Sequence, residues 1–105
     1  MKIEWENIAE QKAKEIGKYI RRSFGLKRMK VFGEQIRHTT DLLILNPYMG
    51  VLDPLLSGRS QSYRSILINR LSKMVYYVDE KEGVIHISAF WDCRCEPLAQ
   101  SEHLK

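Results

Sequence analysis

The sequence predicts an α+β domain in which a strand, an antiparallel pair of helices and a three-stranded antiparallel meander follow one another. Apolar residues recur at helical spacing on both sides of Gly25, which predicts two consecutive helices. Three later runs are rich in Ile, Val and aromatic residues and are separated by short connections, which predicts the meander. We therefore expect the helical hairpin to cover one face of a small sheet.

The first strand and the first helix lie before Gly25. Ile3 and Trp5 alternate with polar residues, which suits a short strand with both side chains facing inward. Asn7 is the expected N-cap of the helix, and Glu10 completes a capping-box arrangement three residues later. Gly25 is the expected stop, because glycine readily adopts the left-handed backbone that ends helices. The apolar stripe of this helix consists of Ala9, Ala13, Ile16, Ile20 and Phe24.

The second helix is expected to start near Leu26 and to end before Pro47, which cannot continue a helix. Because the turn at Gly25 is very short, the two helices must pack as an antiparallel hairpin. Beyond Pro47, Gly50 and Gly58 belong to an irregular connection of about a dozen residues, longer than most loops. The expected apolar stripe of the second helix is Met29, Phe32, Ile36, Thr39 and Leu43.

The three predicted strands cover residues 63–70, 74–79 and 84–91. Residues 71–73 and 80–83 are short enough to be hairpin turns, so neighbouring strands should be antiparallel. The second face of the last strand has a mixed composition, which predicts partial exposure. Strict alternation places Ile85, Ile87, Ala89 and Trp91 on one face of that strand and Val84, His86, Ser88 and Phe90 on the other.

Length and composition favour a single cytoplasmic domain. The chain has 105 residues, enough for one modest core, and we expect the domain to span residues 1–97 with a tail at 98–105. No window has the roughly 18 uninterrupted apolar residues of a membrane-spanning helix, and the N-terminus lacks the apolar stretch of a secretory signal. Cys93 and Cys95 are too close together for a disulfide scaffold or for the usual zinc-ligand spacing, so we expect no metal or other cofactor.

The charge balance indicates a polyanion or an acidic protein as partner. Lys and Arg number 17 against 13 Asp and Glu, which gives a net charge of +4. The basic residues form two groups along the chain. For the first group, a solvated face that only keeps the protein soluble is an equally good explanation. The first group is Lys18, Arg21, Arg22, Lys27, Arg28 and Lys30, and the second is Arg59, Arg64, Arg70 and Lys73.

Several short sequence signals follow one another along the chain. They are Trp5, Tyr19-Ile20, Phe24-Gly25, LNP at residues 45–47, Gly50, YRSILI at 63–68, MVYYVD at 74–79, IHI at 85–87 and DCRCEP at 92–97. With this order and spacing, the chain resembles the RelE/ParE superfamily of bacterial toxins from about Ile3 to Pro97. The topology expected from periodicity is also the one that this superfamily has.

The resemblance implies the toxin of a type II toxin-antitoxin pair, of the kind that stabilises plasmids. ParE-like members inhibit DNA gyrase without nuclease residues, whereas RelE-like members cleave messenger RNA in the ribosomal A site. Both are usually neutralised by an antitoxin from the same operon, which lies along the toxin and hides its working face. The implied partners are therefore an antitoxin and either gyrase or the ribosome with its message, and a homodimer or a toxin-antitoxin hetero-oligomer is possible.

A metal-independent endoribonuclease needs a base, an acid and cations that stabilise the charged phosphorane. Arg64 and Arg94 match positions where the superfamily commonly places arginine, and they are the candidate cations. Glu96 is a candidate base, but the histidines fall in mid-strand, on a helix and in the tail, so none is well placed by the sequence. We therefore favour the ParE-like, non-nuclease alternative over the endoribonuclease.

The sequence also leaves plainer alternatives open. Arg64 and Arg94 can each form an ion pair with Asp79, Asp92 or Glu96 instead of binding a target. A third reading of the whole chain is a degenerate superfamily member that binds the antitoxin or DNA in autoregulation of its operon. The surface that binds the target or nucleic acid is expected to include Arg59, Arg64, Arg70, Lys73 and Arg94.

Overall fold

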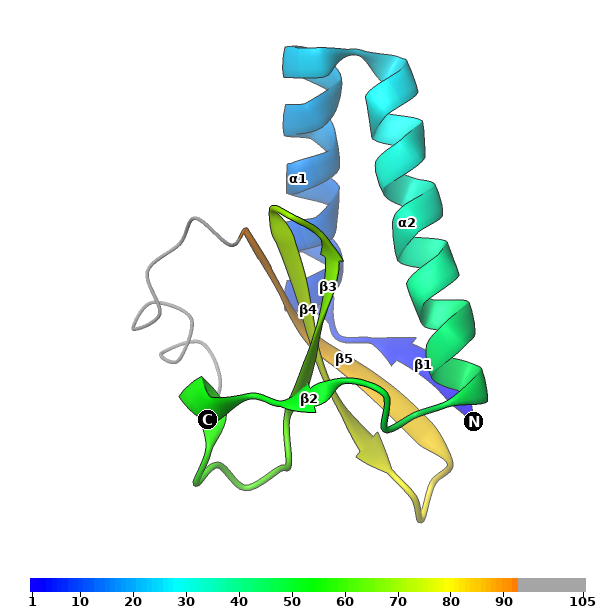
Figure 1. Ribbon diagram of the computed structural model, residues 1–105, viewed down its shortest axis with the longest axis vertical. Helices are drawn as coiled ribbons and strands as arrows, with labels where there is room; N and C mark the ends of the chain where they lie inside the picture. Colours follow the sequence, from blue (N-terminus) through cyan, green and yellow to red (C-terminus); the bar gives the residue numbers. More distant parts are fainter. Residues whose placement is uncertain (93–105) are drawn as a thin grey trace.

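The computed structural model describes residues 1–92 and confirms the α+β architecture, with a helical hairpin packed on one face of a five-stranded sheet (Figure 1). The predicted tail at 98–105 lies outside the described residues, as do the last positions of the predicted domain. The elements are β1 (Lys2–Trp5), α1 (Asn7–Phe24), α2 (Leu26–Leu45), β2 (Val51–Leu52), the 3-10 turn η1 (Pro54–Leu56), β3 (Arg64–Asn69), β4 (Ser72–Asp79) and β5 (Val84–Asp92).

The sheet has the strand order β1-β5-β4-β3-β2 and mixes two kinds of pairing. Strands β2 to β5 pair antiparallel with their neighbours, as predicted for the meander. Strand β1 runs parallel to β5 instead, with Lys2 opposite Val84 and Trp5 opposite Ile87. The last described strand therefore lies inside the sheet, between β1 and β4, and most of its residues are buried.

Strand β2 and the turn η1 are additions to the predicted order, within the connection that follows α2. The two residues of β2 are exposed and pair with the start of β3. A strand of two residues cannot show alternation, which is why the sequence predicted only an irregular segment here. Asp53 caps η1, since its carboxylate accepts a hydrogen bond from the Leu55 N–H at 3.0 Å.

The start of α1 differs from the predicted capping box. The helix begins at Asn7 with no side-chain cap, so the assignment of Asn7 and Glu10 as a capping pair was wrong. Glu6 occupies the N-cap position, and its carboxylate accepts a hydrogen bond from the Ser88 hydroxyl at 2.6 Å. The Glu6 N–H also donates to the Ile87 carbonyl at 3.0 Å. Contacts with β5 therefore fix this helix end, and no local sequence pattern reveals them.

The turn between the helices confirms the predicted antiparallel hairpin (Figure 1). Gly25 has a φ of 97° and its N–H donates to the Arg21 carbonyl at 2.9 Å, which ends α1 where the sequence predicted. Helix α2 follows at once and continues through Gly33 to Leu45.

The main core lies between the hairpin and the sheet, and both predicted helical stripes contribute to it. From α2, the Phe32 ring meets the Phe90 ring of β5 edge to face, with centroids 5.9 Å apart. Burying a ring of this size stabilises the fold by about 2–3 kcal/mol. Phe24 departs from its predicted place, because it is 62% exposed at the end of α1. The stripe therefore leaves the core before the helix ends.

A bulge in β5 changes which side chains face the helices. The register of β4 with β5 skips Ser88, so that one extra residue is inserted there. Because the alternation has a period of two, one extra residue exchanges the two faces beyond it. The predicted strict alternation was therefore wrong beyond the bulge: Ile87 and Phe90 share the main core, while Ala89 and Trp91 lie in a second cluster.

The loop after α2 is held against the sheet by a close approach at Gly50. Its N–H donates to the hydroxyl of Tyr76 at 2.9 Å, and Tyr76 is fully buried in the main core. A Cβ at Gly50 would lie 2.7 Å from the Tyr76 hydroxyl oxygen and 2.9 Å from the Ser65 carbonyl oxygen. Only glycine fits at this contact without displacing the sheet.

We predict that Gly50→Ala destabilises the protein by about 2–3 kcal/mol, because the added methyl overpacks a site enclosed by backbone and a buried ring. Gly33→Ala is the matched control, since no atom lies within 4 Å of a Cβ built there. In mid-helix that change should instead stabilise by up to about 1 kcal/mol. Urea unfolding of both variants measures the two effects, and equal shifts in the same direction would contradict this explanation of Gly50.

Candidate functional site

The predicted binding cations do not lie on one surface. Arg64 pairs with Tyr76 across β3 and β4, so its side chain starts on the face that carries the helices. Its guanidinium donates to the carbonyl of Gly50 at 2.8 Å and to that of Tyr48 at 3.4 Å. It also lies over the Tyr48 ring, 5.2 Å from the centroid. Among the described residues, Arg64 therefore fastens the loop after α2 through backbone carbonyls rather than through a carboxylate of Asp79 or Asp92.

Lys73 lies on the opposite face of the sheet from Arg64 and in strand β4, not in the predicted turn. Its ammonium is 3.1 Å from a carboxylate oxygen of Asp53, and the two side chains are only 16% and 3% exposed. Because Asp53 also caps η1, this ion pair fixes the loop onto the second face of the sheet. Lys73 is thus engaged in holding the fold together.

The other predicted site residues are dispersed. Arg59 follows η1 on the second face, where its charge acts on Tyr63. Arg70 lies in the turn between β3 and β4, beside the ends of the helices. Arg94 and Glu96 lie outside the described residues, as do Cys93 and Cys95. The assignment of Arg94 as a candidate cation and of Glu96 as a candidate base stays a prediction.

The second face of the sheet carries a row of rings that the sequence analysis did not single out. Tyr77 and His86 are directly opposite each other in β4 and β5, and their rings stack with centroids 4.7 Å apart. Tyr63 meets Tyr77 edge to face at 5.7 Å. The sequence places His86 in mid-strand, and this strand position sets its ring in the row. Pairing β4 with β5 in the correct register would have found it.

The row is surrounded mainly by acidic groups. Burial raises the pKa of Tyr77, and the carboxylate of Glu6 raises it further. Burial likewise raises the pKa of Tyr63, with Glu6 adding to the effect and Arg59 opposing it. The Nδ1 atom of His86 lies 3.9 Å from a carboxylate oxygen of Glu4. Carboxylates repel phosphates, so this part of the face suits a cation better than a nucleic acid.

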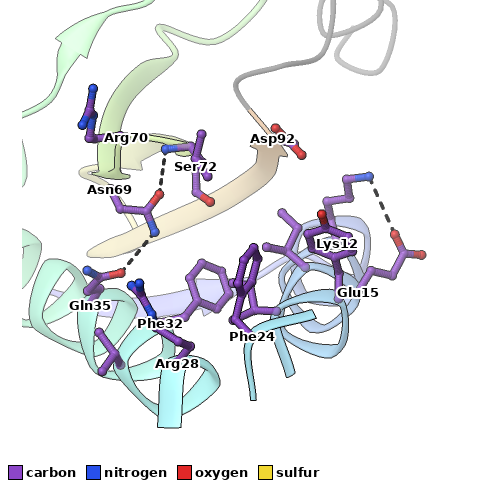
Figure 2. Close-up of a pocket in the computed structure, with 15 residues that line it drawn as sticks. Lys12, Glu15, Phe24, Arg28, Phe32, Gln35, Asn69, Arg70, Ser72 and Asp92 are labelled. Carbon is purple, nitrogen blue, oxygen red and sulfur yellow. Dashed lines mark hydrogen bonds and ion pairs between the residues drawn. The ribbon is translucent and has the colours of Figure 1, made fainter. Parts of the chain in front are cut away.

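A groove of about 530 Å³ opens between the outer ends of the helices and the β3–β4 turn (Figure 2). The Asn69 amide donates to the Gln35 side-chain oxygen at 3.1 Å and so ties the turn to α2. Phe32 reaches the groove from the core side. The groove thus has a fixed shape set by both layers of the fold.

The lining of the groove is apolar and its rim carries charge (Figure 2). Among the lining side chains, Phe24 is 62%, Leu71 54% and Val31 41% exposed. Lys12, Arg28 and Arg70 supply positive charge at the rim, and Glu15 and Asp92 supply negative charge there (Figure 2). An exposed apolar hollow with a polar rim is typical of a protein-binding surface.

Two further features bear on the kind of site. Within residues 1–92, no three His, Cys, Asp or Glu side chains come together in a way that would hold a metal ion. No helix in the same part of the chain is long and apolar enough to cross a membrane.

Comparison with protein families decides the assignment. Residues 3–96 match the family described as the ParE toxin of the type II toxin-antitoxin system parDE. The chain belongs to this family. A search of the curated proteins gives no match. The predicted superfamily is thus confirmed, and the protein is the toxin of a type II pair whose partner is an antitoxin.

We predict that Lys73→Met costs this toxin about 2–4 kcal/mol of stability, because it leaves the buried Asp53 carboxylate without its cation. Asp53→Asn should cost less, since the amide oxygen still caps η1. In the double variant the two losses should not add, and the coupling energy should be about 1–3 kcal/mol. Urea unfolding of the three variants measures the cycle. Additive losses would mean that the ion pair contributes nothing.

The raised pKa values of Tyr63 and Tyr77 predict loss of stability at high pH. A pKa above the ordinary value of 10.0 means that the fold favours the neutral phenol. The contribution of each neutral phenol to the free energy of unfolding is complete below pH 10 and is lost as the pH rises through the pKa of the folded state. The urea midpoint should therefore fall above about pH 10, and less steeply in Tyr77→Phe. A midpoint with the same pH dependence in both proteins would refute this assignment.

Proposed function

We propose that this toxin arrests growth by binding DNA gyrase in the cytoplasm, without cutting nucleic acid, and that an antitoxin from the adjacent reading frame neutralises it. Membership of the ParE family supports the toxin and antitoxin parts. The observation that carries the non-nuclease part is the engagement of Arg64 with the loop after α2.

A phosphate clamp needs a cation that is available to the substrate. One nitrogen of the Arg64 guanidinium donates to the Gly50 carbonyl and the group lies over the Tyr48 ring, so turning the group toward a phosphate would release the loop, and only the N–H donors outside these contacts could reach a phosphate without such a turn. Lys73 is held by Asp53, whose buried carboxylate would be left unpaired. Two of the predicted cations are thus already used by the fold, which favours a toxin that acts by binding.

The RelE-like endoribonuclease is the alternative, and the stack of Tyr77 on His86 is the observation that favours it. Both groups can in principle move a proton. Against this, the acidic residues beside the stack would repel the phosphate that such a site must bind. The test of gyrase inhibition and transcript cleavage given below therefore includes the variant His86→Ala.

We infer that the antitoxin occupies the groove between the helix ends and the β3–β4 turn. The exposed side chains of Phe24, Val31 and Leu71 offer an apolar surface, and Arg28 and Arg70 flank it. An amphipathic antitoxin segment with apolar residues on one side and acidic residues at its edges has the matching chemistry. The expected assembly is a toxin-antitoxin hetero-oligomer.

Induction of the toxin should stop growth, and the purified protein should inhibit supercoiling by gyrase while cellular transcripts stay uncut. The reason is that a toxin acting by binding needs no free phosphate clamp. Supercoiling assays and transcript-end mapping are the measurements. His86→Ala should remain as inhibitory as the unchanged protein.

Cuts in phase with codons, absent in His86→Ala, together with unaffected gyrase would replace this proposal by the endoribonuclease. Folded protein that leaves growth, gyrase and transcripts untouched would instead identify a degenerate family member.

For the groove, we predict that Val31→Asp with Leu71→Asp leaves the toxin active but weakens antitoxin binding by about 3 kcal/mol, roughly a hundredfold in Kd. Both positions are exposed, so the fold tolerates the charges. Leu45→Asp is the control, because Leu45 is 82% exposed and does not line the groove. Growth with co-expressed antitoxin is the measurement, and rescue of both variants would exclude this groove.

A further inference from the structure

The turn of the helical hairpin carries a concentrated positive charge, of which the proposed function uses only Arg28. We call residues 18–30 the hairpin tip, which projects beyond the sheet (Figure 1). No Asp or Glu occurs between residues 16 and 33. Six cations lie in the tip and all are exposed: Lys18, Arg21, Arg22, Lys27, Arg28 and Lys30.

None of the six tip cations has a carboxylate partner in the part of the chain that the structure describes. The ion pairs of residues 1–92 involve other basic groups, those of Lys2, Lys12, Lys14, Lys73 and His86. The two halves of the hairpin thus bring like charges together without compensation. Such repulsion costs stability, and an anionic partner would remove it.

The charges on α2 are also unfavourable for the helix itself. Arg21 and Arg22 lie at the C-terminus of α1, where cations interact well with the helix dipole. Lys27 and Arg28 lie in the first turn of α2, the positive end, which has no acidic residue and no side-chain cap. Helix stability therefore explains the first two positions and not the others.

The remaining side chains of the tip narrow the choice of polyanion. Tyr19 and Phe24 meet edge to face at 6.4 Å and both line the groove, so their rings belong to the apolar surface of the groove rather than to a separate stacking platform among the tip charges. Apart from Tyr19 and Phe24, Leu26 is the one exposed large apolar side chain in residues 18–30. A single leucine offers too little apolar surface to insert into a bilayer. What remains is a compact set of charges with the chemistry of phosphate recognition.

We propose that the hairpin tip binds the phosphate backbone of double-stranded DNA without reading its sequence. A rigid duplex presents many phosphates to a projecting tip and needs no stacking surface, which matches what the tip offers. This contact is separate from inhibition of gyrase, and five of its six cations, all but Arg28, lie outside the antitoxin groove.

The test is fluorescence anisotropy of the purified full chain with a labelled DNA duplex at several salt concentrations. The tip variant carries Arg21→Gln, Arg22→Gln and Lys27→Gln, none of which lines the groove. The control carries Lys2→Gln, Lys14→Gln and Lys81→Gln, which changes the net charge equally at exposed positions elsewhere. The tip variant should bind at least about tenfold more weakly than the control, and its slope of log K against log salt should be smaller by roughly 2–3.

Equal weakening in the two variants would mean that net charge, not the tip, attracts DNA, and would overturn the proposal. So would binding only to single-stranded RNA, only to double-stranded RNA or only to anionic vesicles, each measured in parallel. Circular dichroism and urea unfolding establish that both variants are folded. Because the assay uses purified protein and DNA alone, its failure is distinguishable from a failure to inhibit gyrase.

Discussion

The arrangement of every surface in this toxin depends on strand β5 and its bulge at Ser88. β5 pairs with β1 on one side and β4 on the other, so it cannot shift without breaking both ladders. The bulge keeps Ile87 and Phe90 on the face that the helices cover. The Ser88 hydroxyl also holds Glu6, which fixes where α1 begins. The position of the hairpin, and hence of the groove and the tip, follows from this one strand.

The two groups of basic residues that the sequence shows consequently differ in how the fold uses them. Arg64 and Lys73 are drawn into the fold because the loop after α2 must be fastened to both faces of the sheet. The tip cations have no such partner among residues 1–92, and they are exposed on a turn that projects beyond the sheet (Figure 1). A cation that holds a buried carboxylate or a backbone carbonyl is costly to remove, whereas an exposed one remains available to a partner. Binding should therefore be sought on the helical side of the molecule.

Features that repeat along the sequence, such as apolar stripes, were predicted correctly, whereas features that depend on a single residue or contact were not. The apolar stripes from Ala9 to Ile20 and from Phe32 to Leu43 repeat at helical spacing, and they were placed correctly. The bulge at Ser88 is a single inserted residue, so alternation gave the wrong face beyond it. The contact of Arg64 with Gly50 joins a strand to a loop, and no spacing rule links the two positions. The ring row of Tyr77 and His86 likewise required the strand register.

Hydrogen exchange of the toxin, free and bound to its antitoxin, tests this division of surfaces most directly. Exchange reports which backbone amides become protected when a partner covers them. New protection is expected in the outer halves of α1 and α2 and in the β3–β4 turn, with the second face of the sheet unchanged. Protection confined to the face that carries Tyr63, Tyr77 and His86 would contradict it.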